Sequence, residues 1–168
     1  MDKRNFYFDQ TVEDVDLKAV QDNTEKADHN LAKDIVGAGI VSGFEVLPNT
    51  PADFTIRYTH GVAYDAYGQR IEAPGDGTKD CLPYAVSTSG NERWLTIVAR
   101  FARNSYDDRL DGNGNHILYK SDEYFEIAIL EGTVAPIGTA VRPTPATGDV
   151  VLTDIRLYFG QASITALD

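Results

Sequence analysis

The sequence predicts a mainly β protein: an antiparallel β-sandwich or barrel-like domain preceded by one N-terminal α-helix. One long segment, residues 13–35, contains neither Gly nor Pro and spaces its apolar side chains as a helix does. The rest of the chain alternates apolar and polar residues in short runs that Gly, Pro and Asp interrupt. Because helices and strands do not alternate along the chain, a parallel α/β sheet is not expected.

Two parts of the chain are expected to have different roles. Residues 1–36 hold an aromatic N-terminal segment and the helix, which we expect to serve oligomerisation or docking. Residues 37–168 are expected to form the β domain. A chain of 168 residues is long enough for one such domain to bury its own core.

Composition narrows the classes of partner. The chain carries 26 acidic and 15 basic residues, a net charge of −11. Phosphate binding depends on Lys and Arg, so no nucleic-acid partner is expected. No apolar run approaches the roughly 20 residues that cross a bilayer, and the N-terminus lacks the apolar core of a signal peptide, so we expect no membrane insertion. Cys81 is the single cysteine, which excludes an intrachain disulfide and fits production in a reducing cytoplasm.

Three aromatic residues lie close to the N-terminus: Phe6, Tyr7 and Phe8. Aromatic rings bury large apolar areas, so a cluster of three on a polar terminus needs a covering surface. The sequence leaves two surfaces open, the chain's own β domain and a neighbouring subunit.

The predicted helix carries a narrow apolar seam, whose positions follow one another at steps of three and four residues. It consists of Leu17, Val20, Thr24, Ala27 and Leu31. This spacing is typical of a coiled coil rather than of a helix lying on a broad sheet. A helix of this length is marginal alone in water, so the seam needs a partner face. That face is either on the chain's own β domain or on other copies of the helix, and Gly37 is expected to end the helix.

The first half of the β domain is predicted to contain short strands. We expect strands over residues 40–47 and 54–60, a hairpin over residues 60–74, and a short strand over residues 81–86. Gly68 is expected in the hairpin turn because it tolerates the positive φ that two-residue loops require.

The second half of the β domain contains the most strongly apolar segment. Residues 94–102 are predicted to form the central strand, and residues 104–115 a polar loop. Further strands are expected over residues 117–119, 124–130 and 150–159, with an irregular excursion over residues 131–148.

One motif has the spacing of a calcium-binding loop. Its candidate ligands are Asp111, Asn113, Asn115 and Asp122. The position that is Gly in such loops is His116, and the flanking segments are predicted strands rather than helices. Asn and Gly also form turns without any metal, so the sequence favours a plain turn and no bound metal or cofactor.

No motif indicates catalysis. The three histidines, His29, His60 and His116, lack metal-ligand spacing, and Cys81 is expected to be a buried thiol. Asp65 and Glu72 flank the hairpin turn, and two carboxylates at a set separation can hydrolyse glycosides, but an acidic β protein offers such pairs by chance. We therefore expect no enzyme, with a glycan hydrolase as the least favoured interpretation.

Two parts of the chain together resemble tail fibre and baseplate proteins of tailed bacteriophages. The first runs from RNFYFDQTVEDVDLKAVQDNTEKADHNL through GAGIVSGFEV, an aromatic-acidic opening followed by a polar helix and a glycine-containing strand. The second is the hairpin HGVAYDAYGQRIEAP with the strand before it. The resemblance covers about the first 75 residues and contains no catalytic residue.

The resemblance implies a virion structural protein of the tail, baseplate or fibre-attachment region, made in the host cytoplasm and often trimeric. Its expected partners are other tail or baseplate proteins and further copies of itself. The alternative is a carbohydrate-binding or receptor-binding β domain that meets a bacterial surface glycan. The residues expected at subunit contacts are Phe6, Tyr7, Phe8, Leu17, Val20, Ala27 and Leu31.

Overall fold

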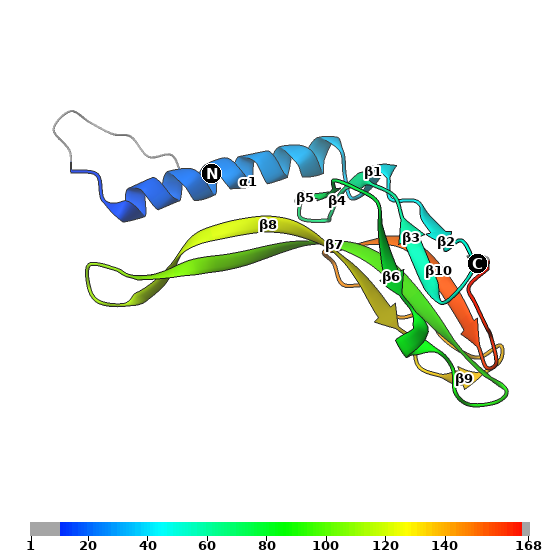
Figure 1. Cartoon of the computed structure of the whole chain (residues 1–168). Coiled ribbons are helices and arrows are strands. Elements are labelled where there is room, and N and C mark those ends of the chain that lie inside the picture. Colours follow the sequence, from blue (N-terminus) through cyan, green and yellow to red (C-terminus); the bar gives the residue numbers. More distant parts are fainter. Residues whose placement is uncertain (1–10, 166–168) are drawn as a thin grey trace.

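The computed structural model describes residues 11–165 and confirms the predicted fold class. Strands make up 46% of the described residues, their sheets are antiparallel, and one α-helix precedes them. Figure 1 shows a β body at one end, from which helix α1 and a long two-stranded arm project in the same direction. The body is sandwich-like because small sheets pack over a larger one.

Helix α1 spans Asp14–Ile35, within a residue of the predicted bounds. Its start is a capping box: Glu13 accepts a backbone N–H of the first turn, and Asp16 accepts the N–H of Glu13. Gly37 follows the helix with φ of 75°, a conformation that Gly adopts without a Cβ penalty. Both ends of the helix are thus set by local sequence.

Six short strands form two small sheets. Strands β1 (Gly39–Gly43), β4 (Gly61–Tyr64) and β5 (Arg70–Ala73) form one; β2 (Val46–Pro48), β3 (Thr55–Tyr58) and β6 (Gly77–Asp80) form the other. The prediction of one strand over residues 40–47 is wrong, because the chain turns at Phe44 from one sheet to the other. Phe44 has φ of 56°, and its ring is buried in the core, which stabilises the strained backbone.

The predicted strand over residues 81–86 is also wrong. The chain forms a 3₁₀ turn, η1, at Leu82–Tyr84. Pro83 cannot donate to a strand ladder, and the Asp80 carboxylate accepts the Leu82 N–H at 2.8 Å, which favours the turn.

The third sheet carries the two longest strands. It consists of β7 (Asn91–Leu110), β8 (His116–Glu131) and β10 (Asp149–Tyr158), with the short β9 (Ala135–Pro136) paired to the start of β7. Strand β7 lies between β10 and β8, so the prediction of a central strand here is confirmed.

The prediction of a polar loop over residues 104–115 is wrong. Strands β7 and β8 pair in one register from Leu95–Glu131 to Leu110–His116, with a single gap at Asp107, so the segments 117–119 and 124–130 belong to one strand. Strand β10 accompanies β7 only as far as Arg100, and residues 101–125 continue as a two-stranded ribbon, here called the arm. The arm has no buried face, so its sequence lacks the apolar alternation that marks a half-buried strand.

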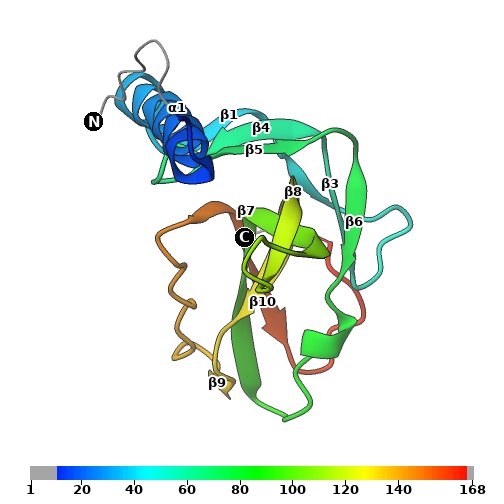
Figure 2. The same cartoon turned by 90° about the vertical axis from the view of Figure 1, so that its left-hand side faces the viewer.

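The inner half of β7 is buried on both faces. Leu95, Ile97 and Ala99 belong to the hydrophobic core beneath the small sheets. Val98 faces the opposite way and is also fully buried. The segment between β8 and β10 runs along one side of β7, as Figure 2 shows in gold to orange. The body therefore encloses β7, and the enclosure ends where the arm begins.

We predict that Gly68→Ala destabilises the seating of α1 on the body. A Cβ at Gly68 would lie 2.0 Å from the carbonyl oxygen of His29 in α1, and Gly68 has φ of 84°. Strain of this kind typically costs about 1–3 kcal/mol. The measurement is thermal unfolding together with proteolysis at the joint after α1. Gly75→Ala is the matched control, because its Cβ would meet nothing within 4 Å; equal stability of both variants would contradict the prediction.

Candidate assembly surface

Helix α1 exposes its apolar seam. No residue of α1 is buried, and Leu17 and Leu31 are 62% and 59% exposed. Val20 and Thr24 are exposed as well, and Ala27 is half-buried. A helix that docks on its own domain through an apolar face would bury that face. The predicted seam residues therefore share one face, as expected, but residues 11–165 do not cover that face.

The arm contacts α1 through other residues. Arg103 of β7 pairs with Glu25 of α1 and, at 2.6 Å, with Glu123 of β8. A cleft of about 610 Å³, the helix–arm cleft, lies between the two elements. Its helix side is polar, and its arm side includes Ile117, Leu118 and Tyr119. Among the described residues, one ion pair, Arg103–Glu25, thus joins the helix to the arm.

The arm exposes large apolar side chains on both faces. They are Tyr106, Leu110, Ile117, Leu118, Tyr119 and Tyr124, each at least 39% exposed. Both edges of the arm are also unpaired within the described residues, since β10 ends opposite Arg100 and β8 is the edge of its sheet. A two-stranded ribbon alone is marginally stable, and open edges invite pairing. These features make the arm a candidate contact surface.

The arm does not follow from apolar periodicity, but one signal of it is present in the sequence. Residues equidistant from the Asn113 turn are complementary: Arg103 faces Glu123, and Ser105 faces Ser121. Such symmetry of polar residues about an Asn-Gly sequence indicates a hairpin even when apolar alternation is absent.

The calcium-like motif forms the turn at the tip of the arm. The Asp111 carboxylate accepts the backbone N–H groups of Asn113 and Asn115, both at 2.8 Å, and it also accepts a hydrogen bond from the Asn115 side-chain amide. The bond from the Asn115 side chain, together with the backbone bonds, lowers the pKa of Asp111. Asp122 lies in β8 opposite Asn104 and accepts the Tyr106 hydroxyl at 3.1 Å. The structure thus brings Asp111, Asn113 and Asn115 together but leaves Asp122 along the arm. Among residues 11–165, no three His, Cys, Asp or Glu side chains are placed to hold a metal ion.

A second groove lies at the base of the arm. This arm-base groove has a volume of about 340 Å³. It is lined by Arg70, Glu72, Pro74, Phe101, Glu123, Tyr124 and Phe125. Arg70 and Glu72 form an exposed ion pair on β5, and Tyr124 is 52% exposed. The groove therefore combines aromatic rings with charged groups that can form hydrogen bonds.

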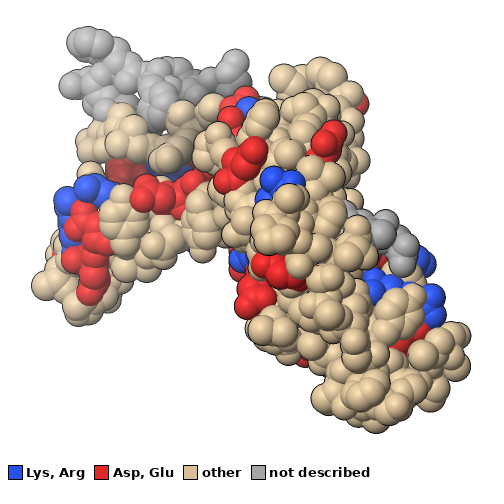
Figure 3. All heavy atoms as spheres, turned by 45° about the vertical axis from the view of Figure 1, so that its right-hand side comes forward, with Lys and Arg blue, Asp and Glu red and all other residues tan. Residues whose placement is uncertain are grey.

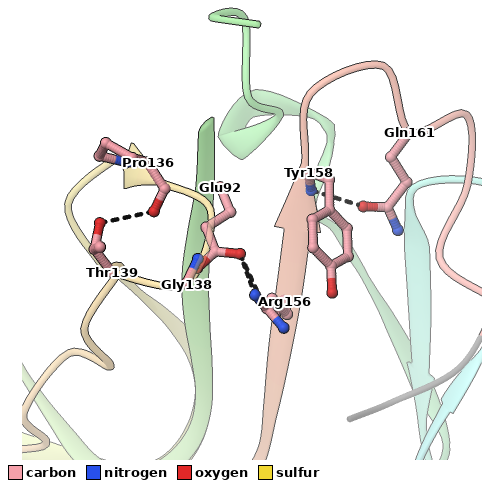
Figure 4. Close-up of polar contacts among 7 residues, drawn as sticks. All are labelled: Glu92, Pro136, Gly138, Thr139, Arg156, Tyr158 and Gln161. Carbon is pink, nitrogen blue, oxygen red and sulfur yellow. Dashed lines mark hydrogen bonds and ion pairs between the residues drawn. The ribbon is translucent and has the colours of Figure 1, made fainter. Parts of the chain in front are cut away.

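The buried carboxylate of Glu92 anchors the excursion between β8 and β10 to the sheet (Figure 4). Glu92 is 1% exposed; it accepts the Gly138 N–H at 2.8 Å and the Nε–H of Arg156 at 2.8 Å. Burial alone would raise the pKa of Glu92, but the Gly138 N–H and the Arg156 guanidinium outweigh it and hold the pKa below the usual 4.5. Beside them, the Arg142 guanidinium lies 4.2 Å from the centre of the Trp94 ring. The Glu92 carboxylate is fully engaged by these partners, so we interpret the cluster as structural.

The candidate glycosidase pair does not converge. Asp65 is 1% exposed, and its carboxylate accepts the N–H groups of Tyr67 and Gln69, which closes the β4–β5 turn. Glu72 lies on the exposed face of β5 and pairs with Arg70. Strand alternation places the two carboxylates on opposite faces of the hairpin, so they cannot flank one glycosidic bond.

The remaining candidate groups lie apart from one another. His29 is in α1, His60 lies 3.3 Å from Asp76 in the body, and His116 lies 2.8 Å from Asp108 at the arm tip. Cys81 is fully buried, and burial raises the pKa of its thiol to about 12, so it is not a thiolate at neutral pH. Phe6, Tyr7 and Phe8 lie outside the described residues.

Charge is spread over the molecule. Figure 3 shows acidic and basic side chains interspersed on arm and body over the face in view, rather than gathered into one basic patch.

No protein-family model, curated protein or solved structure matches the chain. Within residues 11–165, no helix is long and apolar enough to cross a membrane. The function of these surfaces has to be inferred from their own chemistry.

We predict that Glu92→Gln destabilises the body in a pH-dependent way. The folded-state pKa of Glu92 is lowered, so its contribution is fully present above pH 4.5 and is lost as the pH falls through that lower pKa. The variant should therefore melt several degrees below the parent at pH 7, and the difference should shrink in acid. Urea unfolding across this range is the measurement.

Glu131→Gln is the control, because Glu131 makes a similar Arg pair at 2.9 Å but is 59% exposed. It should change stability little at any pH. If the loss of stability in Glu92→Gln were the same at every pH, the charge of Glu92 would not be what anchors the segment between β8 and β10, and the prediction would be wrong.

Proposed function

We propose that this chain is a structural protein of a phage tail, baseplate or fibre-attachment region and acts by subunit assembly. The observation that carries the proposal is that α1 and the arm project together from the body and expose apolar side chains on both. The resemblance of the first 75 residues to tail fibre and baseplate proteins supplies the setting.

The energetics favour a covering partner. Burying a side chain such as Leu or Ile contributes about 1.5–3 kcal/mol, so leaving Leu110, Ile117 and Leu118 in water forgoes several kcal/mol. Monomeric proteins rarely keep such patches in solvent without a role. The body, by contrast, has a closed core. The arm is therefore the part that fits a contact with other virion proteins.

The titratable groups among the described residues support a catalytic role less well than the exposed arm supports an assembly role. Asp65 and Glu72 face opposite ways, the Glu92 carboxylate is fully engaged, and the Cys81 thiol is protonated and enclosed. Assembly requires none of these groups to react.

We predict that shortening the arm abolishes incorporation into particles while the body stays folded. The variant replaces residues 104–122 with Asn-Gly, which joins Arg103 to its register partner Glu123 through a two-residue turn. Gradient-purified phage particles from cells that encode the chain should contain the parent protein and lack the variant when analysed by mass spectrometry. Thermal unfolding of the purified variant should change by only a few degrees, because the arm buries little.

Absence of the parent protein from such particles would contradict the tail role. A variant that still enters particles would show that the arm is not the contact.

The second candidate function is binding of a bacterial surface glycan at the arm-base groove. The observation that favours it is the combination of an exposed Tyr124 ring with Arg70 and Glu72 around one groove. Sugars present apolar C–H faces and hydroxyl edges, which such a groove can match.

If the groove binds glycan, Tyr124→Ala should weaken binding to polysaccharide extracted from the host surface at least tenfold. Calorimetric titration is the measurement. Tyr67→Ala is the control, since Tyr67 is 57% exposed but does not line the groove. No binding by the parent protein would exclude this function.

A further inference from the structure

Three hollows of the surface join into one groove between α1, the arm and the body. Two of them are the helix–arm cleft and the arm-base groove, and the third, of about 230 Å³, lies between the C-terminal half of α1 and the body. Arg70 and Phe101 line both the third hollow and the arm-base groove, and Glu123 lines all three. The hollows are therefore continuous, and together they are called the long groove here.

We infer that the long groove binds an extended segment of a partner protein in which basic and apolar residues alternate. The inference rests on the proposed assembly function and names the chemistry of one partner. It is carried by the charge of one wall of the groove, the apolar side chains of the other wall, and the length over which the two walls run together.

The long groove is acidic. Six carboxylates and three cations line it; the cations are Lys18, Arg70 and Arg103, and the carboxylates are Asp14, Asp22, Glu25, Asp28, Glu72 and Glu123. Arg70 pairs with Glu72, and Arg103 pairs with both Glu25 and Glu123. Two of the three cations are thus already engaged by the groove's own carboxylates.

The remaining carboxylates all lie on the α1 wall. Asp14, Asp22 and Asp28 form no ion pair among residues 11–165. A cationic side chain of a ligand would gain a new pair at each of them, whereas an anionic ligand would meet like charge. Charge complementarity therefore favours Lys or Arg in the occupant and disfavours an anionic polysaccharide.

The arm wall is apolar toward the tip of the arm. Ile117, Tyr119, Ser121 and Glu123 all line the groove, and they share one face of β8 because alternate residues of a strand point the same way. Both Ile117 and Tyr119 are exposed. The groove thus has carboxylates along the helix and apolar side chains along the arm.

An extended chain matches two such unlike walls. Asp14 and Asp28 are separated by about 21 Å along α1, at the helical rise of about 1.5 Å per residue. About six or seven residues of extended chain span that length, and their side chains point alternately to opposite sides. Basic residues at every second position would face the helix, and the apolar residues between them would face Ile117 and Tyr119.

Peptide binding tests the inference. The probe is a fluorescein-labelled peptide, Lys-Val-Lys-Val-Lys-Val-Lys, and its fluorescence anisotropy is titrated with the full-length protein. The parent should bind it, and binding should weaken as the ionic strength rises, because salt screens charge pairs in an open groove. A peptide of the same composition with its Lys residues grouped together, Lys-Lys-Lys-Lys-Val-Val-Val, should bind more weakly.

Two pairs of variants test the two walls. Asp22→Asn with Asp28→Asn should weaken binding about fivefold, whereas Asp34→Asn with Glu45→Gln makes the same change of charge outside the groove and should leave binding unchanged.

On the arm, Ile117→Ser should weaken binding about tenfold. Leu110→Ser is its control, because Leu110 is also exposed but does not line the groove. Thermal unfolding of each variant shows whether its fold is kept.

Three results would overturn the inference. They are no binding of the alternating peptide by the parent, equal binding of the two peptides, and equal losses in the groove variants and their controls. Binding of host polysaccharide that the Asp22 and Asp28 substitutions leave unchanged or strengthen, without binding of the peptide, would assign the groove to a glycan and overturn it as well.

The inference and the proposed function fail in different ways. A parent protein that binds the peptide through the groove but is absent from phage particles refutes the tail role and leaves the groove. A parent protein that enters particles but does not bind the peptide refutes the groove and leaves the tail role.

Discussion

The rest of the structure depends on the long antiparallel pairing of β7 and β8, which is interrupted at Asp107, whose φ is 65°. From Leu95–Glu131 to Leu110–His116 the register never shifts, so the two strands form one ribbon that crosses the body and leaves it. Inside the body the ribbon is enclosed on both faces by the small sheets and the Glu92-anchored excursion. Beyond Arg100 it loses β10, and both faces meet solvent. Because the same two strands are packed in the core and continue as the arm, the packing of the core fixes the direction in which the arm projects.

Helix α1 is positioned by two contacts with this framework, neither of which buries its apolar residues. The β4–β5 turn approaches the His29 carbonyl so closely that only Gly fits at residue 68, and farther along the helix Glu25 pairs with Arg103. Partly exposed ion pairs contribute about 1 kcal/mol or less, so they orient a helix more than they stabilise it. The arrangement suits a helix whose stability is completed by a partner.

Local signals explain which elements the sequence could predict. The capping box at Glu13, the helix-ending Gly37 and the absence of Gly or Pro between them specify α1 without reference to the rest of the fold. The inner half of β7 was predictable because burial on both faces requires a continuous apolar run. The break at Phe44 was not, since its positive φ is stabilised by a distant core. The arm was not, because a ribbon exposed on both faces imposes no apolar period. At the candidate site, the seam could therefore be predicted, whereas its exposure and the arm beside it required the structure.

The separation of the two surfaces has a consequence for assembly. Arg103 faces α1, and strand alternation places Tyr106 and Tyr124 on the opposite face of the arm. The seam of Leu17, Val20 and Leu31 lies on another face of α1 than the polar residues that line the helix–arm cleft. Contacts at the seam and contacts at the open face of the arm would therefore use different residues, and one would not block the other.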